Sequence, residues 1–75
     1  MIRQPENFPE QVKDVRQQLK LSQEELAHAL GVSFATVNRW ENGKSAPSKL
    51  AQRQFDLFCN EQIKKGKLAR GKVQL

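Results

Sequence analysis

Asn38 and Arg39 are adjacent polar residues whose side chains can each make a pair of hydrogen bonds to one planar partner. An arginine can donate two parallel hydrogen bonds to O6 and N7 of guanine, and an asparagine can pair with N6 and N7 of adenine. Phe34 and Ala35, a few positions earlier, can contact the methyl group of thymine. The chemistry open to these residues is therefore the recognition of base edges in duplex DNA.

The segment around them has the periodicity of a short helix over residues 33–42. At about 100° per residue, Val37 and Trp40 fall on one face of this helix, with Phe34 at its exposed first turn. The opposite face carries short or polar side chains and one long arginine, namely Ala35, Asn38, Arg39 and Asn42. A helix with such a face can enter a major groove about 12 Å wide.

A second short helix is predicted immediately before it. Ser22 and Glu25 have the spacing of a capping box, and the apolar pattern that follows stops at Gly31. Ala27 places a small side chain where the two helices must approach each other closely. Two short helices joined by a tight glycine turn predict a helix-turn-helix, a motif that reads DNA.

Two further helices complete the predicted fold, which is an all-α, compact bundle of four to five helices. One begins after Asn7 and carries an inward stripe of Phe8, Val12, Val15 and Leu19. The other follows Pro47, ends near Cys59 and carries Leu50, Ala51, Phe55 and Phe58 inward. The predicted organisation is an N-terminal arm at 1–6, the helical domain at 7–59 and a basic tail at 60–75.

Composition agrees with a small nucleic-acid-binding domain. The 75 residues include thirteen Lys and Arg against eight Asp and Glu, a net charge of +5, which favours a polyanionic partner. We expect a cytoplasmic chain of bacterial, phage or archaeal type, with no membrane span and no secretory signal, because no long apolar run is present. The single cysteine, Cys59, fits a reducing compartment and is expected to be a partly buried apolar residue.

The stretch LSQEELAHALGVSFATVNRWENGKSAP, residues 21–47, resembles the phage repressor and Cro-like helix-turn-helix domains, also called the xenobiotic response element family. The resemblance covers residues 8–58. It implies a lambda-repressor-like fold and a sequence-specific transcriptional regulator, most simply a repressor. It also implies that Arg16 and Glu41 form a partly buried salt bridge between the first and third helices.

The resemblance and the chemistry of the side chains together assign roles to individual positions. Base contacts are expected from Phe34, Ala35, Asn38 and Arg39. Phosphate contacts that position the domain are expected from Gln23, Ser33, Asn42, Lys44 and Ser45. Four of these residues also have a plainer interpretation: Arg39 as a solvated residue, Phe34 as a core-edge residue, Gln23 as an ordinary first-turn residue and Asn42 as a helix-end residue.

The chain departs from well-studied members in two respects. Phe34 and Ala35 stand where some members carry amides, so no base preference can be transferred. The C-terminal part is short and basic, whereas many members dimerise through an apolar fifth helix. A homodimer on two half-sites about 34–36 Å apart is the default expectation, and its contacts would use the helix after Pro47, the tail or DNA itself.

Other functions are compatible with the same pattern. The chain could be the DNA-binding antitoxin of a toxin–antitoxin pair, with the tail folding on a toxin as protein partner, or a protein-interaction module that retains the fold. No enzyme is expected, because no nucleophile–base set and no phosphate-binding glycine loop is present. No cofactor is expected either, and His28 lacks the neighbours of a metal site.

Overall fold

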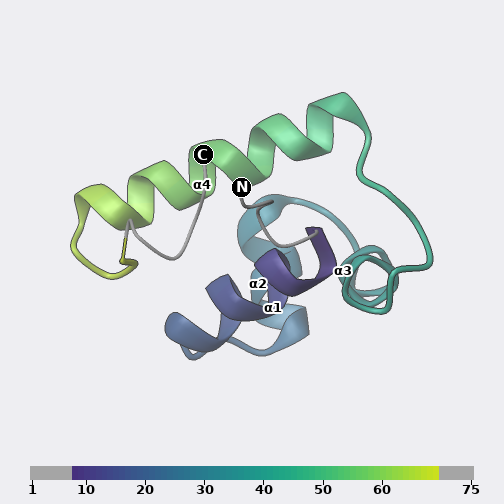
Figure 1. Ribbon diagram of the computed structural model, residues 1–75, viewed down its shortest axis with the longest axis horizontal. Helices are drawn as coiled ribbons and strands as arrows, with labels where there is room; N and C mark the ends of the chain where they lie inside the picture. Colours follow the sequence, from purple (N-terminus) through teal and green to yellow (C-terminus); the bar gives the residue numbers. More distant parts are fainter. Residues whose placement is uncertain (1–7, 70–75) are drawn as a thin grey trace, which may run out of the picture.

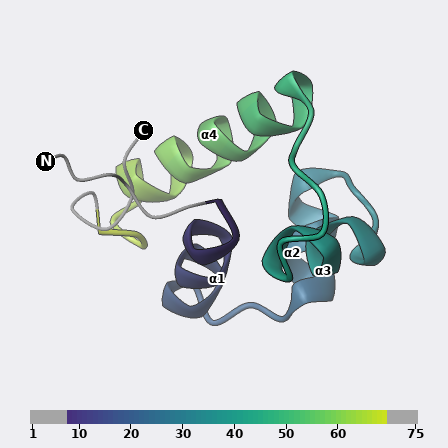
Figure 2. The same ribbon diagram turned by 45° about the vertical axis from the view of Figure 1, so that its right-hand side comes forward.

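The computed structural model describes residues 8–69, and these contain four helices and no strand (Figure 1). The helices are α1 (Phe8–Gln18), α2 (Gln23–Leu30), α3 (Phe34–Glu41) and α4 (Lys49–Lys64). The three short helices form a cluster, and the longer α4 lies along one side of it in both views (Figures 1 and 2). The all-α prediction is confirmed. The predicted arm at 1–6 and the predicted cap at Asn7 lie outside the described residues.

The helix ends of the helix-turn-helix follow from local side-chain chemistry. The hydroxyl of Ser22 accepts from the backbone N–H of Glu25 at 3.0 Å, and the Glu25 carboxylate accepts from the Ser22 N–H at 2.8 Å. At the other end of α2, Gly31 has φ of 76°, a left-handed conformation that glycine adopts at low cost. The capping box and the glycine stop are therefore both confirmed.

A single apolar core holds the four helices together. Phe8 packs edge-on against both Trp40 and Phe55, with ring centroids 5.3 Å apart in each pair, so that α1 joins α3 to α4. The buried apolar residues are Val12, Val15, Leu26, Ala27, Leu30, Val37, Trp40, Phe55, Cys59 and Leu68. Most of these positions are those that the helical periodicity predicts.

Two predictions about side chains of α4 are wrong. Leu50 is 71 % exposed rather than inward, because at 100° per residue it lies about 140° around the helix from the buried Phe55. Cys59 is fully rather than partly buried, because it follows Phe55 by one helical turn on the same face.

The predicted helix end near Cys59 and the predicted tail boundary at residue 60 also differ from the structure. Helix α4 continues to Lys64, since no residue before Gly66 favours a helix stop, and Gly66 has φ of 76°. The chain then turns back, Leu68 is buried in the core, and the N–H of Ala69 donates to the Gln18 side chain at 3.2 Å. Residues 60–69 are therefore part of the folded domain, and residues 70–75 lie outside the described part of the chain.

Candidate nucleic-acid interface

Helix α3 presents one face to the core and the other to solvent. Val37 and Trp40 are buried, and Phe34 is 51 % exposed at the first turn. Among the polar and small residues predicted to face outward, Ala35, Arg39 and Asn42 are exposed and Asn38 is half-buried. The observed helix thus carries an outward surface of short side chains from which one arginine projects.

The position of α3 is set by the turn that precedes it. The N–H groups of Gly31 and Val32 donate to the carbonyl oxygens of His28 and Ala27, at 3.2 and 3.0 Å, and close the end of α2. Ala27 is buried between the helices, and its small side chain permits the close approach that the sequence predicts. This short connection fixes the direction in which α3 leaves the turn.

A chain of side-chain hydrogen bonds joins α3 to the other two short helices. Asn42 donates to Asn38 at 3.1 Å, Asn38 donates to Gln23 at 3.1 Å, and Gln23 donates to Glu41 at 3.0 Å. Three residues predicted to contact DNA are therefore connected to one another. Glu41 then continues the connection to α1 through its contact with Arg16.

Arg16 and Glu41 form a bidentate ion pair between α1 and α3. Arg16 Nε lies 2.7 Å from Glu41 Oε2, and Arg16 Nη2 lies 3.0 Å from Glu41 Oε1. A third donor of Arg16, Nη1, reaches the carbonyl oxygen of Leu21 at 3.1 Å. The Glu41 side chain is 3 % exposed and that of Arg16 is 21 % exposed, so the pair is mostly removed from water. The pair predicted from the family resemblance is present in the structure.

The environment of Glu41 determines its charge state. Burial alone raises the pKa of this carboxyl, but the hydrogen bonds from Arg16 and Gln23 and the positive charge of Arg16 outweigh that effect. The net result is a pKa below the ordinary value for glutamate. The hydrogen bond to Glu41 correspondingly raises the pKa of Arg16, so the pair is fully ionised near neutral pH.

The predicted phosphate contacts lie at the two ends of α3 and the start of α2. Ser33 is the N-cap of α3, and its hydroxyl accepts from the Thr36 N–H at 3.1 Å. Asn42 ends the helix, and Gly43 follows with φ of 71°. Lys44 and Ser45 come directly after this glycine and are exposed, whereas Gln23 is half-buried at the start of α2.

The sequence pattern did not predict two contacts at this site, of which the first joins Asn38 and Gln23. The two residues are 15 positions apart and lie on different helices, so no helical spacing relates them. The second is the hydrogen bond from Gln23 to Glu41, 18 positions away. These contacts can be predicted only when the way in which α2 and α3 cross is known.

Other kinds of site are not found in the described part of the chain. No group of three or more potential metal ligands occurs among residues 8–69, and His28 is exposed on α2. None of the four described helices has the length and apolar character that a bilayer crossing needs. Burial raises the pKa of the Cys59 thiol to about 12, with a further contribution from Asp56, so this thiol is not an activated nucleophile.

Comparison with known proteins gives a consistent result. The family model described as "Helix-turn-helix" matches residues 12–50, from within α1 to the start of α4. The chain is also 45 % identical over 42 residues to the type II methyltransferase M1.ScrFI of Lactococcus lactis subsp. cremoris. That match covers 52 % of this chain but 11 % of the methyltransferase, so the chain spans a small part of that relative. No solved structure gives a significant match. The match over residues 12–50, together with the α2–turn–α3 geometry, shows that this chain belongs to the phage repressor and Cro-like family of helix-turn-helix DNA-binding domains.

Proposed function

We propose that this chain is a sequence-specific DNA-binding regulator that inserts α3 into the major groove and acts as a repressor. The observation that carries the proposal is the outward face of α3, where Arg39 is exposed and makes no ion pair with any described residue. The neighbouring Ala35 and Asn42 are short, so the backbone of α3 can approach the base edges closely. Arg39 can then donate both of its parallel N–H groups to O6 and N7 of one guanine.

Asn38 would contribute a base or phosphate contact in an orientation set before DNA binds. Its amide nitrogen uses one hydrogen on Gln23, and its amide oxygen accepts from Asn42. The second amide hydrogen and the second lone pair of the oxygen stay available for a ligand. A side chain already held in place loses less conformational entropy on binding, which favours affinity.

Phosphate contacts would come from polar groups on both sides of α3, while Phe34 and Ala35 would contact a thymine methyl. We assign the phosphate contacts to Gln23, Ser33, Asn42, Lys44 and Ser45. Lys44 is the cation of this set and is exposed, so it would release counterions from DNA and contribute about −0.9 to the slope of log K against log salt. The amides and hydroxyls would fix orientation without reading sequence.

Repression is the simplest consequence of such binding, because a bound domain excludes other proteins from the same site. This activity would operate in the cytoplasm, where the DNA of a bacterial, phage or archaeal system lies. The methyltransferase activity in the name of the L. lactis relative belongs to a protein of which this chain matches 11 %, and we do not assign it here.

Selection of bound duplexes from a random DNA pool, with competitor DNA and near-physiological salt, tests the proposal. An enriched motif is the expected result, and its symmetry would show whether one or two copies bind. Enrichment without a motif would leave a non-specific phosphate binder. No enrichment would contradict the proposal and favour a module that binds protein.

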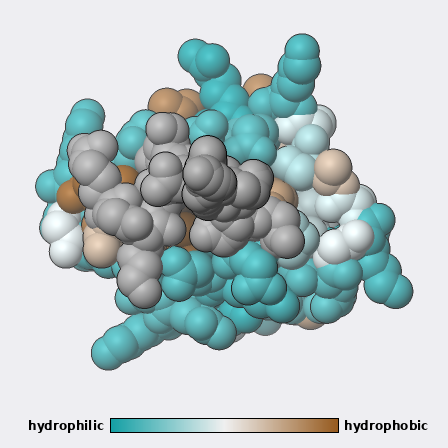
Figure 3. All heavy atoms as spheres, viewed as in Figure 1, coloured by the Kyte–Doolittle hydropathy of each residue, from teal (hydrophilic) through white to brown (hydrophobic). Residues whose placement is uncertain are grey.

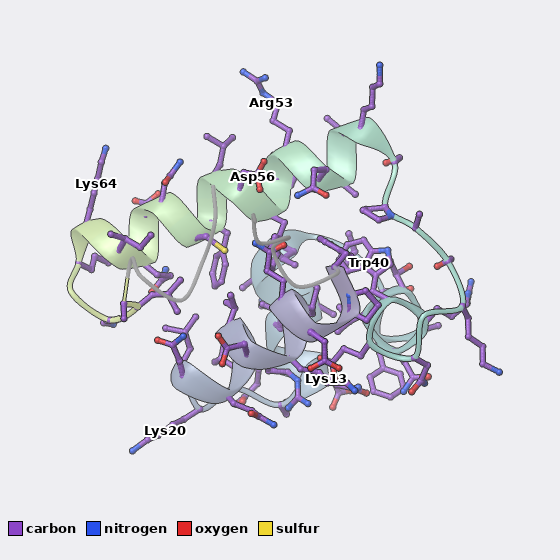
Figure 4. All side chains as sticks on the ribbon, viewed as in Figure 1. Lys13, Lys20, Trp40, Arg53, Asp56 and Lys64 are labelled. Atoms are coloured by element: carbon purple, nitrogen blue, oxygen red, sulfur yellow. The ribbon has the colours of Figure 1, made fainter. Side chains whose placement is uncertain are left out.

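The variant Arg39→Ala then tests the assigned base contact. We expect it to lower affinity for the selected motif by roughly 1–3 kcal/mol and to leave non-specific binding nearly unchanged. Lys20→Ala is a suitable control, because Lys20 is an exposed cation that points away from α3 (Figure 4). An equal loss on every sequence would remove Arg39 from the base-reading residues.

A further inference from the structure

Glu41 differs from the other charged residues of the described chain in being buried. Hydrophilic side chains cover much of the face seen in Figure 3, whereas Glu41 is the one buried polar or charged residue among residues 8–69. Burying a carboxylate is costly even beside an arginine, so the ion pair alone is weak evidence for a purely stabilising role. Besides Arg16, the Glu41 carboxylate contacts the side-chain amide of Gln23, and this contact has a direction.

The carboxylate of Glu41 fixes the direction of the Gln23 amide. A carboxylate only accepts hydrogen bonds, whereas an amide donates from its NH2 group and accepts at its oxygen. The NH2 group of Gln23 must therefore face Glu41, and Nε2 of Gln23 lies 3.0 Å from Oε1 of Glu41. The oxygen of the Gln23 amide is then the end that meets α3, where it accepts from Asn38.

The same constraint passes to Asn38 and then to Asn42. Because Gln23 offers an oxygen, Asn38 must offer its NH2 group, and Nδ2 of Asn38 lies 3.1 Å from Oε1 of Gln23. The oxygen of Asn38 is then the end that accepts from Nδ2 of Asn42, at 3.1 Å. Reversal of one amide alone would place two donors or two acceptors against each other. We call Gln23, Asn38 and Asn42 the amide relay, and Glu41 gives it a single direction.

A fixed direction matters for base reading because it orders the free donor and the free acceptor of Asn38. Beyond its two internal hydrogen bonds, Asn38 keeps one N–H on the Gln23 side and one oxygen lone pair on the Asn42 side. Adenine presents the acceptor N7 beside the donor N6 in the major groove, and this order is reversed when a T·A pair replaces A·T. An amide of one direction therefore fits adenine on one strand better than adenine on the other.

We propose that Glu41 is a positioning residue that sets base preference without touching DNA, by fixing the direction of the amide relay. The inference rests on the proposed function, because it requires Asn38 to face a base. Glu41→Gln removes the constraint, since a glutamine can turn either its oxygen or its NH2 group towards Gln23. The relay can then run in either direction, and the order of donor and acceptor at Asn38 is no longer fixed.

NMR of the side-chain amides in the 15N-labelled free chain tests the direction of the relay. The original chain should show one set of NH2 signals for each of Gln23, Asn38 and Asn42. In Glu41→Gln the signals of all three should split or broaden together, because both directions are populated. Arg16→Lys is the matched control: a lysine cannot make all the contacts of the Arg16 guanidinium, but the carboxylate remains, so the signals should stay single.

Binding to two duplexes tests the consequence for base preference. The duplexes carry A·T or T·A at the position of the selected motif where Asn38→Ala relaxes the preference. Glu41→Gln should lower the ratio of the two affinities at least about fivefold, the lower end for one bidentate contact, whereas Arg16→Lys should keep the ratio. Circular dichroism at the binding temperature confirms that each variant is folded.

Three results would overturn the proposal. Unchanged amide signals in Glu41→Gln would do so, and so would an affinity ratio that falls equally in Glu41→Gln and Arg16→Lys. An Asn38→Ala variant that relaxes no position of the motif would also contradict it. If the original chain selects no motif, the proposed function and the base-reading role fail together, while the NMR comparison reports the direction of the relay in either case.

Discussion

The side-chain amide of Asn38 on α3 donates a hydrogen bond to the side-chain oxygen of Gln23 on α2, with 3.1 Å between Nδ2 and Oε1. Gln23 donates in turn to the buried Glu41 at 3.0 Å. Asn38, which is proposed to read bases, and Gln23, which is proposed to contact phosphate, therefore hold each other in place, and Glu41 anchors Gln23. The position of Asn38 on the outward surface of α3 is therefore fixed by hydrogen bonds that lead to the buried Glu41.

The first prediction concerns the coupling between Gln23 and Asn38. A double-mutant cycle with Gln23→Ala and Asn38→Ala should give an interaction energy of about 0.5–1.5 kcal/mol in the free energy of unfolding, measured in urea. As a control, Gln23→Ala combined with Ser48→Ala should be additive, since Ser48 caps α4 and shares no contact with Gln23. Additivity in the first cycle would show that the hydrogen bond contributes nothing measurable.

Removal of Arg16 should strongly destabilise the domain, because it leaves the Glu41 carboxylate buried without its charged partner. We expect Arg16→Ala to cost roughly 3 kcal/mol in the free energy of unfolding, at the low end for a buried pair because Arg16 is partly exposed. Arg53→Ala, at an exposed position, should change it by less than about 0.5 kcal/mol. If the two variants lost similar amounts of unfolding free energy, the ion pair would not be an important source of stability.

Acid should weaken the domain through Glu41. The pKa of Glu41 in the folded chain lies below its ordinary value, so the unfolded chain takes up a proton first as the pH falls. The contribution of Glu41 is therefore complete above the ordinary glutamate pKa of about 4.3 and is lost as the pH falls through the lower, folded-state pKa. Thermal unfolding of the original chain and of Glu41→Gln, followed between neutral and acid pH, should show a smaller acid-dependent loss in the variant. If the stabilities of the two chains fell equally with decreasing pH, Glu41 would make no pH-dependent contribution.

The thiol of Cys59 should be unreactive while the chain is folded. It is fully buried, and burial together with Asp56 raises its pKa to about 12, so little thiolate forms at pH 8. A disulfide exchange reagent such as Ellman's reagent should react at the rate at which the chain opens, and rapidly in denaturant. The destabilised Arg16→Ala chain should react faster than the original. Immediate reaction of the folded original chain would mean that α4 detaches readily near Cys59.

Much of the fold is predictable from the sequence because its determinants are local. The capping box at Ser22 and Glu25, the stop at Gly31 and the apolar periodicity of Val37 and Trp40 each act within a few residues. The buried and exposed faces of α3 follow from the same periodicity, and so does the choice of the α3 residues proposed to contact bases. The ion pair between Arg16 and Glu41 was anticipated from the family resemblance rather than from spacing.

The tertiary structure decided those features that depend on contacts between residues far apart in the sequence. Local pattern did not distinguish Leu50, exposed on the first turn of α4, from the buried apolar residues of the same helix, because the inward face of α4 is set by where it packs. The burial of Leu68 likewise requires the chain to turn back after Gly66. The hydrogen bond from Asn38 to Gln23 exists because α2 and α3 cross at one particular place. The sequence alone determined the helices, the ends of α2 and α3 and the family. The docking of the helices determined which polar groups hold the surface proposed to contact DNA and which face of α4 is left exposed.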